Sequence, residues 1–529
     1  MPATNPNLAA SLFERARLEG WGRRVALRQG DRAWTYDQLG AQVGRVASAL
    51  RSLRVSPGER VALLMRDTLE AAASLLGVIH AGAVAVPLSE LSTATDVKAY
   101  LQHAGVAVAI VEASLEPALD EIRAELPALR EVLCVGAGSA GLRDFHAMVA
   151  AAAPHGAPAV VLADHPSVLL YSAGAGPDEL RGVPHTAATI AAAHASFGLG
   201  ALGLGLGDRI LSTVRLATAF GLGCGLFFPL TVGAEVALMP EQPRSETLFA
   251  ALEQFVPTVM CSTPTVFAQL AHDAQLGGRH QPLVELRRAV AGAEGLSAEQ
   301  ATLIRDALGV PLTVGFGLTE TFSFVLAVAS DDAAWPTRGS SCGRPLTGVD
   351  ARVVDDDGAL VGADVIGTLQ LRTGALFTGY WGDAPEADAP RPDGWFTTRD
   401  RFMVDEAGLF HHCGRIDDLF KVGGKWVSPQ EIERVLTAHE SVWECAVIGA
   451  EDEDGFAKPL AFVVANVGED VGPALEESLR AYVKQTLAPY KYPRWIEFVD
   501  ELPRGPSGKV LRYRLRAPRR RLRAETGHR

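Results

Sequence analysis

The sequence lacks the excess of basic residues that is typical of nucleic-acid-binding proteins. Its 49 Lys and Arg residues are outnumbered by 62 Asp and Glu residues, which gives a formal net charge of −13. Because a basic surface is the electrostatic signature of nucleic-acid binding, we predict no nucleic-acid partner. The basic stretch RYRLRAPRRRLRAETGHR, which begins at Arg512, has two interpretations, a solvated tail or a docking arm.

Cysteine is scarce, and the motifs of metal sites are missing. The six cysteines are widely spaced, with no CxxC pair and no histidine cluster beside them. This pattern argues against a disulfide framework and against a zinc site, and it favours a reducing, cytoplasmic location. The first residues, MPATNPNLAASLFERARLEG, carry charges where a signal peptide needs an apolar stretch, so we predict no export.

Long apolar runs are absent, with one near exception. Residues 216–234, LATAFGLGCGLFFPLTVGA, form 19 uncharged residues, close to the length of a membrane span. Four glycines and Pro229 interrupt them, which predicts a buried helix–turn–strand passage and no membrane partner. The GxxxxGK[ST] signature is also missing, which excludes a P-loop NTPase at the level of the motif.

Short apolar runs alternate with longer stretches of helical periodicity, such as LEAAASLLGVIHAG and SETLFAALEQF. This alternation predicts an α/β fold with mainly parallel sheets. Strands are predicted at residues 61–65, 83–88, 106–111, 167–172, 209–214, 235–239, 258–262 and 287–292.

The 529 residues are too many for one typical core, so at least two domains are expected. Short, turn-rich segments over about 340–414 predict a small β-rich subdomain at the end of an N-terminal domain, residues 1–414. Residues 415–529 have their own alternation of strands and helices, which predicts a separate C-terminal domain.

Several long motifs occur late in the chain and in a fixed order. They are GFGLTET (315–321), GWFTTRD (394–400), GRIDDLFKVGGKWVSPQEIE (414–433) and LPRGPSGKVLR (502–512). Together with WTYDQL and PGERVALLM upstream, they resemble the acyl-adenylate-forming superfamily, and within it the benzoate-CoA ligases. The resemblance implies two parallel-type sheets flanked by helices in the large N-terminal domain and a smaller, mobile α+β C-terminal lid domain.

The resemblance implies an aryl-CoA ligase that uses ATP, Mg²⁺ and coenzyme A. An attacking carboxylate and the α-phosphate of ATP repel each other unless cations neutralise both. Lys509 matches the family lysine that bridges these two groups. Thr319 and Glu320 match the pair that contacts the α-phosphate and holds magnesium, an ion that protein sites often bind through one carboxylate and a phosphate. The surrounding motif implies that Gly315 and Gly317 lie near the adenine.

Further motif residues are implied to bind the rest of the nucleotide and coenzyme A. Asp400 matches a carboxylate that accepts hydrogen bonds from the ribose hydroxyls, and Arg415 matches an arginine near ribose and phosphate. Asp417 matches the hinge at which the C-terminal domain rotates between half-reactions. Gly423 and Gly424 match the loop beside the pantetheine channel, although a plain turn is the other interpretation of these glycines.

An aromatic acid pocket follows from the same resemblance. Phe220 lies where benzoate-CoA ligases carry an aromatic ring, and an apolar wall suits a flat acid. Ser323 stands where these ligases often carry histidine. Its smaller hydroxyl could leave room for, or bond to, an ortho amino group, while simple packing remains the alternative. The remaining residues implied to bind the acid are Gly221, Ala293, Gly317 and Lys421.

The stretch YSAGAGPDELRG (171–182) departs from the family's phosphate loop. Ser172 and Gly174 remain, and Arg181 takes the place of the usual lysine, although its planar fork is not equivalent to an ammonium group. Asp178 and Glu179 add negative charge beside a polyphosphate. We therefore expect an active ligase that binds ATP weakly or turns over slowly.

The leading substrates are benzoate and 2-aminobenzoate (anthranilate). Two alternatives stay open: a stand-alone adenylation enzyme that loads a carrier protein, and a pseudoenzyme that binds an adenylate without turnover. A downstream acyltransferase or carrier protein is the expected kind of protein partner, and both a monomer and a homodimer fit the sequence.

Replacing Arg181 by lysine and neutralising Asp178 and Glu179 is expected to lower the Michaelis constant for ATP. The physical reason is that a hydrogen bond to a charged phosphate oxygen contributes roughly 1.5–3 kcal/mol, and the substitutions restore a donor and remove repulsion. The constant is measured at saturating aryl acid, and an unchanged value would show that the loop no longer grips the phosphates.

Overall fold

The structure is a computed structural model. It describes residues 7–139, 141–172, 180–277, 285–292, 296, 298–332, 335, 341–382, 389–416, 418–423, 425–452, 455–504 and 510–516. The chain divides into two compact units, of which unit 1 comprises residues 1–338, 342–350 and 371–396, and unit 2 comprises residues 339–341, 351–370 and 397–529. The predicted domain boundary at residue 414 stays a prediction.

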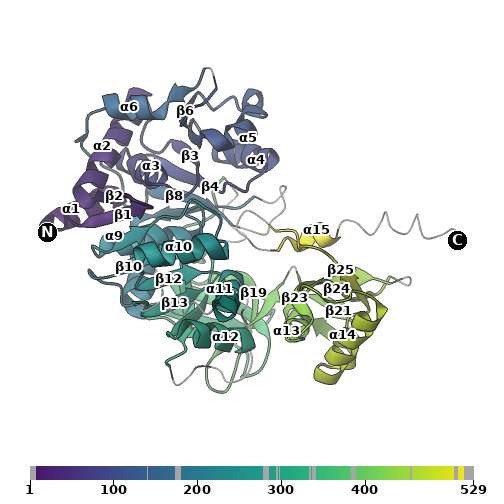
Figure 1. Ribbon diagram of the computed structural model, residues 1–529. Helices are drawn as coiled ribbons and strands as arrows, with labels where there is room; N and C mark the ends of the chain where they lie inside the picture. The colour runs from purple at the N-terminus through teal and green to yellow at the C-terminus, as the bar shows by residue number, and fades with distance from the viewer. Residues whose placement is uncertain are drawn as a thin grey trace. The chain divides into compact units, whose positions relative to one another are not determined.

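One large sheet of unit 1 is parallel through its centre and antiparallel at its edges (Figure 1). Its parallel strands follow from apolar runs without polar alternation, which is the pattern of strands covered on both faces. The order of the described strands is β16 (Arg344–Pro345), β15 (Phe324–Ala329), β14 (Leu312–Gly317), β13 (Arg288–Ala291), β12 (Val259–Ser262), β10 (Arg209–Ser212), β11 (Glu235–Ala237), β1 (Val25–Gln29) and β2 (Arg32–Thr35).

The second sheet of unit 1 is parallel except for its last pair, β8 and β9, which are antiparallel. That hairpin carries the altered phosphate loop between its two strands. The order of the described strands is β7 (Arg143–Asp144), β6 (Glu131–Val135), β5 (Val108–Glu112), β3 (Arg60–Leu64), β4 (Val84–Leu88), β8 (Pro166–Tyr171) and β9 (Gly182–Thr186).

Helices cover both faces of these sheets. Strand β3 shows why: Val61 and Leu63 point into one core cluster, and Ala62 and Leu64 point into another, because side chains alternate along a strand. The cluster of Val61 also includes residues of β1, β10 and β12, so both sheets share it. The α-helices of unit 1 are α1 (Leu8–Leu18), α2 (Tyr36–Ser52), α3 (Leu69–His80), α4 (Ala94–Ala104), α5 (Glu116–Asp120), α6 (Phe145–Ala151), α7 (Ala187–Ala193), α8 (Ala219–Leu222), α9 (Phe228–Thr231), α10 (Ser245–Phe255), α11 (Pro264–Gly277) and α12 (Ala298–Leu308).

The apolar passage 216–234 is helical and buried, and it is not one continuous α-helix. Helix α8 runs into a π-helical turn, η4 (Gly223–Phe227), and then into α9, which ends before strand β11. A π-helical segment, η3 (His194–Ala201), likewise follows α7. In the part of the chain that the structure describes, no helix is long and apolar enough to cross a membrane.

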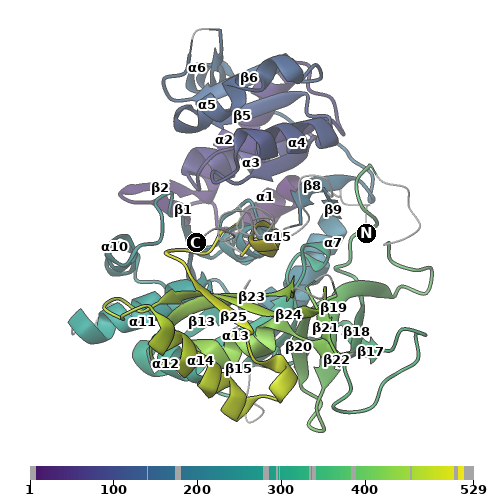
Figure 2. The ribbon, with the colours of Figure 1, turned by 90° about the vertical axis from the view of Figure 1, so that its right-hand side faces the viewer.

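Unit 2 contains most of a four-stranded sheet, and a three-stranded sheet with two helices on one face and a short third helix on the other (Figure 2). Its helices α13 (Pro429–Thr437) and α14 (Pro473–Thr486) pack on the three-stranded sheet through Ile432, Leu436 and Leu479. The other elements are β17 (Val349–Val354), β18 (Gly367–Thr373), β19 (Phe396–Val404), β20 (Phe410–Arg415), β21 (Phe420–Val422), β22 (Lys425–Val427), β23 (Val442–Glu451), β24 (Ala457–Ala465), β25 (Trp495–Phe498) and α15 (Arg512–Arg516).

The prediction of an α/β fold with parallel-type sheets and a smaller β-containing part towards the C-terminus is confirmed. All eight strands predicted at residues 61–292 are present, as β3, β4, β5, β8, β10, β11, β12 and β13.

Candidate active site

The predicted adenine motif forms a sharp turn at the end of β14. Two of its glycines are required by close backbone approach. A Cβ added at Gly315 would lie 2.4 Å from the carbonyl oxygen of Leu326, and one added at Gly317 would lie 2.2 Å from that of Ser323. Both distances are shorter than real side chains tolerate, so any larger residue would push β15 away from β14. The glycines thereby let the chain return directly after the one-turn helix η5 (Thr319–Thr321).

The turn itself is locked by hydrogen bonds and by a buried ring. The Leu318 amide donates to Thr321 Oγ1 at 3.1 Å, and Thr321 Oγ1 also lies 3.0 Å from the Ser323 carbonyl oxygen. Phe322 has a φ of +59°, an uncommon and strained value for a bulky residue. Its side chain is fully buried, and burial of that ring offsets the strain.

His185, on strand β9, holds this turn from the side of the phosphate loop. Its Nε2 lies 2.7 Å from the carbonyl oxygen of Thr319, and its Nδ1 lies 3.2 Å from Thr189 Oγ1. Because a carbonyl oxygen only accepts, Nε2 carries the proton and donates. Burial lowers the pKa of His185 to about 4, although its bond to the Thr319 carbonyl opposes that shift, so the ring is neutral at pH 7.

Glu320 is buried, and Tyr380 binds its carboxylate. The Tyr380 hydroxyl donates to Glu320 Oε1 at 2.7 Å, while the backbone amide of Phe377 donates to the Glu320 carbonyl oxygen at 2.9 Å. Burial and the neighbouring carboxylate both raise the pKa of Tyr380, so the phenol keeps its proton and can donate. The side chain of Glu320 is therefore held in one orientation.

Arg181 contacts the same tyrosine. Its guanidinium carbon is 5.0 Å from the centre of the Tyr380 ring, a cation–π distance. One aromatic ring thus joins the residue predicted to replace the loop lysine to the carboxylate predicted to hold magnesium. At the base of the loop the Ser172 amide donates to the Arg181 carbonyl oxygen at 3.1 Å. Gly174 lies outside the described residues.

Three buried aromatic rings pack against one another near this turn and form an aromatic cluster. Phe220, on α8, stacks on Phe324 with ring centres 4.9 Å apart and an interplanar angle of 17°. Phe197 contacts the same ring at 4.7 Å. A Cβ at Gly292 would lie 2.3 Å from the Phe324 ring and 3.1 Å from that of Phe220, so a side chain there would displace the stack. Ala293 is outside the described residues.

Ser323 is 3% exposed, and within the described part of the chain its Oγ has no hydrogen-bond partner. A buried hydroxyl without a partner costs roughly 1–3 kcal/mol. Among the described residues this hydroxyl is therefore left with the capacity for a further hydrogen bond.

A second group of predicted residues lies in unit 2. Asp400 on β19 and Arg415 on β20 face each other as cross-strand partners. His412 Nε2 lies 2.8 Å from Asp400 Oδ1, and the Asp400 amide donates to Thr398 Oγ1 at 3.1 Å. Asp400 is only 5% exposed. The strand pairing therefore brings these predicted ribose ligands together, with His412 orienting the carboxylate.

The other predicted residues of unit 2 are partly described. Lys421 is exposed on β21. Gly423 lies in the tight turn between β21 and β22 with a φ of +57°, and among the described atoms nothing would contact an added Cβ. Its backbone conformation, and not close packing, favours glycine there. Asp417, Gly424 and Lys509 lie outside the described residues.

Sequence reasoning missed three residues that hold the predicted ones in place: His185, Tyr380 and His412. The signal for His185 was its place directly after the loop, and for Tyr380 an aromatic residue in the turn-rich segment FTGYWG. Neither residue type is unusual by itself, and the partners lie far away in the sequence, so these interactions emerge only from the fold.

Comparison with known proteins identifies relatives over almost the whole chain. A family model described as AMP-binding enzyme matches residues 13–381, and one described as AMP-binding enzyme C-terminal domain matches residues 431–509. The chain is 34% identical to the benzoate–CoA ligase of Thauera aromatica over 513 residues, which cover 97% of this chain and 96% of that protein.

Two solved structures are similar throughout. The crystal structure of the anthranilate CoA ligase AuaEII in complex with anthranoyl-AMP has a TM-score of 0.88 and 32% identity, and the match covers 96% of each chain. A benzoate CoA ligase from Burkholderia xenovorans has a TM-score of 0.87 and 31% identity, with coverage of 96% of this chain and 99% of that one.

Because Glu320 is predicted to hold Mg²⁺, replacing Tyr380 by phenylalanine is expected to raise the apparent dissociation constant for Mg²⁺ roughly 10- to 100-fold, since a hydrogen bond to a charged group is removed. Magnesium titrations of ATP–pyrophosphate exchange measure the change. Tyr36→Phe is the matched control, since the buried Tyr36 hydroxyl donates to the Ala234 carbonyl oxygen at 2.8 Å, away from Glu320. Equal magnesium dependence in both variants would contradict the expectation.

Proposed function

Because this chain belongs to the family of AMP-binding enzymes, which its match over residues 13–381 shows, we propose that it is an ATP-dependent aryl-CoA ligase. In the first half-reaction the carboxylate of an aromatic acid attacks the α-phosphate of ATP, and the bond to pyrophosphate breaks. In the second, the thiol of coenzyme A attacks the acyl carbon, AMP leaves, and the thiol proton passes to solvent. The observation that carries this proposal is the full-length similarity to a benzoate–CoA ligase.

The turn at residues 317–323, which hydrogen bonds hold in place, supports the proposed first half-reaction. Thr319 and Glu320 sit on a segment whose backbone is fixed by His185 and by the close backbone approach at two glycines. A preorganised site needs no reorganisation when charge develops on the phosphate. Thr319 is proposed to contact the α-phosphate, and Lys509 to bridge carboxylate and phosphate, a role that follows from its motif.

Glu320 is proposed to hold Mg²⁺, whose chemistry there is to neutralise phosphate charge. Its carboxylate oxygens are the hard ligands that this ion prefers, and Tyr380 fixes their orientation. Among the described residues, no group of three or more His, Cys, Asp or Glu side chains could hold a metal. Glu320 together with substrate phosphate oxygens therefore forms the proposed ligand set.

Asp400 and Arg415 are proposed to bind the ribose and the phosphate of the nucleotide. Asp400 is buried and accepts a hydrogen bond from His412, which leaves its carboxylate oriented for further donors. Ionised acceptors form stronger hydrogen bonds than neutral ones, which suits the two hydroxyls of a ribose. Lys421, Gly423 and Gly424 are proposed to bind the acyl group and coenzyme A after Asp417 has acted as a hinge.

The aromatic cluster of Phe220, Phe324 and Phe197 supports a flat ring as the acyl part of the substrate. Stacked rings offer a rigid face on which an aryl acid can pack. The unpartnered Oγ of Ser323 supports an acid with a hydrogen-bonding ortho substituent. Benzoate and 2-aminobenzoate are therefore the proposed substrates.

The proposal predicts that the protein, mixed with an aryl acid, ATP, Mg²⁺ and coenzyme A, releases AMP and forms the aryl-CoA thioester. Lys509→Ala is expected to abolish ATP–pyrophosphate exchange. Exchange without thioester, but with loading of a holo carrier protein, would identify an adenylation enzyme. Acid or adenylate binding without any exchange across a panel of aromatic acids would identify a pseudoenzyme.

Replacing Ser323 by alanine is expected to raise the Michaelis constant for 2-aminobenzoate roughly tenfold, the effect of losing one hydrogen bond, and to leave that for benzoate within about twofold. Ser74→Ala is the matched control, because its buried Oγ also has no partner among the described residues and it lies on α3. Both variants are assayed with both acids. An equal change for the two acids in Ser323→Ala would contradict the proposed hydrogen bond.

A further inference from the structure

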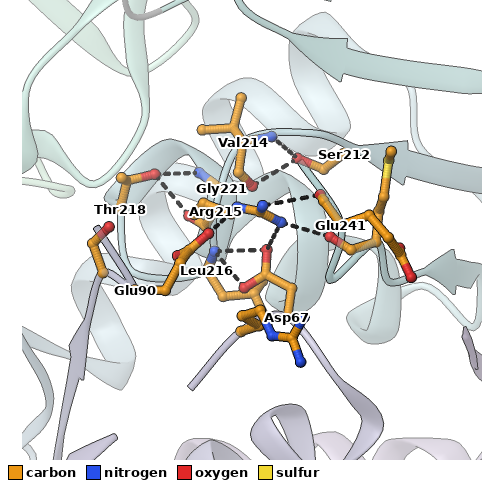
Figure 3. A network of polar contacts seen from close by, with 12 residues as sticks. Asp67, Glu90, Ser212, Val214, Arg215, Leu216, Thr218, Gly221 and Glu241 are labelled. Atoms are coloured by element: carbon orange, nitrogen blue, oxygen red, sulfur yellow. Dashed lines mark hydrogen bonds and ion pairs between the residues drawn. The ribbon is translucent and has the colours of Figure 1, made fainter. Parts of the chain in front are cut away.

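A buried polar cluster surrounds Arg215 in unit 1 (Figure 3). Arg215, 11% exposed at its side chain, lies between two acids. Its Nε is 2.8 Å from Glu90 Oε1, and its guanidinium is 3.8 Å from Asp67 Oδ2. The same guanidinium donates to the carbonyl oxygens of Met239 at 2.6 Å and Glu241 at 3.0 Å.

The cluster joins loops that leave the carboxyl ends of parallel strands in both sheets of unit 1. Asp67 follows β3 and Glu90 follows β4 in one sheet, while Arg215 follows β10 and Met239 follows β11 in the other. The β3–β4 and β10–β11 pairs are parallel. Ligands of open α/β sheets bind at this edge, so the cluster lies where a substrate pocket is built.

The cluster also fixes the turn at residues 215–218, which leads into the helix α8 that carries Phe220. The Leu216 amide donates to Asp67 at 3.2 Å, and Thr218 Oγ1 donates to the carbonyl oxygen of Arg215 at 2.9 Å. Thr218 Oγ1 in turn accepts from the Gly221 amide at 3.1 Å, which caps α8. A Cβ at Gly221 would lie 2.1 Å from the Arg215 carbonyl oxygen, so the turn is closed against α8.

The charges explain why these side chains lie together in the interior. Two buried carboxylates face one guanidinium, with Arg66 and Glu241 as further charged neighbours. Burial raises the pKa of Asp67 to about 7, and Glu90 adds to that shift while Arg215 opposes it. Removing the Arg215 guanidinium would leave Asp67 and Glu90 buried without their counter-ion. A lysine at this position could not donate to the same carbonyl oxygens while contacting both acids, because its ammonium group lacks the planar shape of a guanidinium.

We propose that Arg215, Asp67 and Glu90 act as positioning residues that set the place of Phe220 and so determine the affinity and selectivity for the aromatic acid. This inference rests on the proposed aryl-CoA ligase function. The three residues act through the backbone of residues 214–221, not by contact with the reacting atoms. A misplacement of about 1 Å in a binding surface costs up to about 100-fold in activity.

The test compares Arg215→Lys with Arg287→Lys. Arg287 binds Asp208 in a bidentate manner, with two hydrogen bonds of 2.8 Å, and it also donates to the Leu202 carbonyl oxygen. Asp208 precedes β10 and Arg215 follows it, so the control arginine serves the opposite end of the same strand. Steady-state constants for benzoate, 2-aminobenzoate and ATP are measured at one fixed pH, together with the thermal midpoint of each variant.

We expect Arg215→Lys to raise the Michaelis constant for benzoate roughly 10- to 100-fold and to change the ratio of kcat/KM between the two acids, with the constant for ATP within about twofold. Arg287→Lys is expected to lower the thermal midpoint while leaving that ratio unchanged. The inference would be overturned if the ratio of kcat/KM between the two acids were the same in Arg215→Lys and Arg287→Lys, whatever their thermal midpoints.

If Arg215→Lys does not fold, the variant Thr218→Val tests the same turn. It keeps the shape of the side chain and removes the hydroxyl that links the Arg215 carbonyl to the Gly221 amide. The same shift in acid selectivity is expected, and its absence would overturn the inference. A wild-type protein with no thioester activity towards any aryl acid would instead contradict the proposed function, so the two failures are distinguishable.

Discussion

The burial of polar groups at the carboxyl ends of parallel strands is the constraint on which the rest of unit 1 depends. Helices cover both sheets, so the loops that leave the strands carry carboxylates and carbonyl groups into the interior. An unmatched buried polar group costs roughly 1–3 kcal/mol. The chain supplies partners for several of these groups: the Arg215 guanidinium is the counter-ion of Asp67 and Glu90, and the His185 ring donates to the Thr319 carbonyl oxygen.

Aromatic packing then joins these loops to one another. Phe322 accepts a left-handed backbone conformation because its ring fills the core, and that conformation turns the chain back along β15. Phe324 follows at once and stacks on Phe220, which the Arg215 turn presents from a distant part of the sequence. Each such pair contributes about 0.5–1.5 kcal/mol beyond burial. The polar cluster around Arg215 and the aromatic cluster are therefore connected through one segment of the chain, which runs from Arg215 to Gly221.

The sequence predicts the local features of this fold and misses the interactions between distant segments. Each parallel strand is a short apolar run, and Gly315 and Gly317 stand in a motif where missing side chains signal close approach. The π-helical turns at Gly223–Phe227 and His194–Ala201 could not be predicted, because they depend on how neighbouring elements pack. Likewise, His185 reaches Thr319 and Tyr380 reaches Glu320 across at least 60 positions of the chain. The family resemblance is confirmed, whereas the roles of individual residues stay predictions.

The two ends of the stretch 171–182, which departs from the family's phosphate loop, are held by hydrogen bonds. Its ends are fixed by the antiparallel pair β8–β9, in which Tyr171 faces Gly182 and the Ser172 amide binds the Arg181 carbonyl. This pairing sets the register of β9, from which His185 donates to the Thr319 carbonyl oxygen. Arg181 meanwhile stacks on the tyrosine that orients Glu320. The contacts that hold Thr319 and Glu320, the residues proposed to act at the α-phosphate, therefore come from described residues outside the altered stretch 173–179.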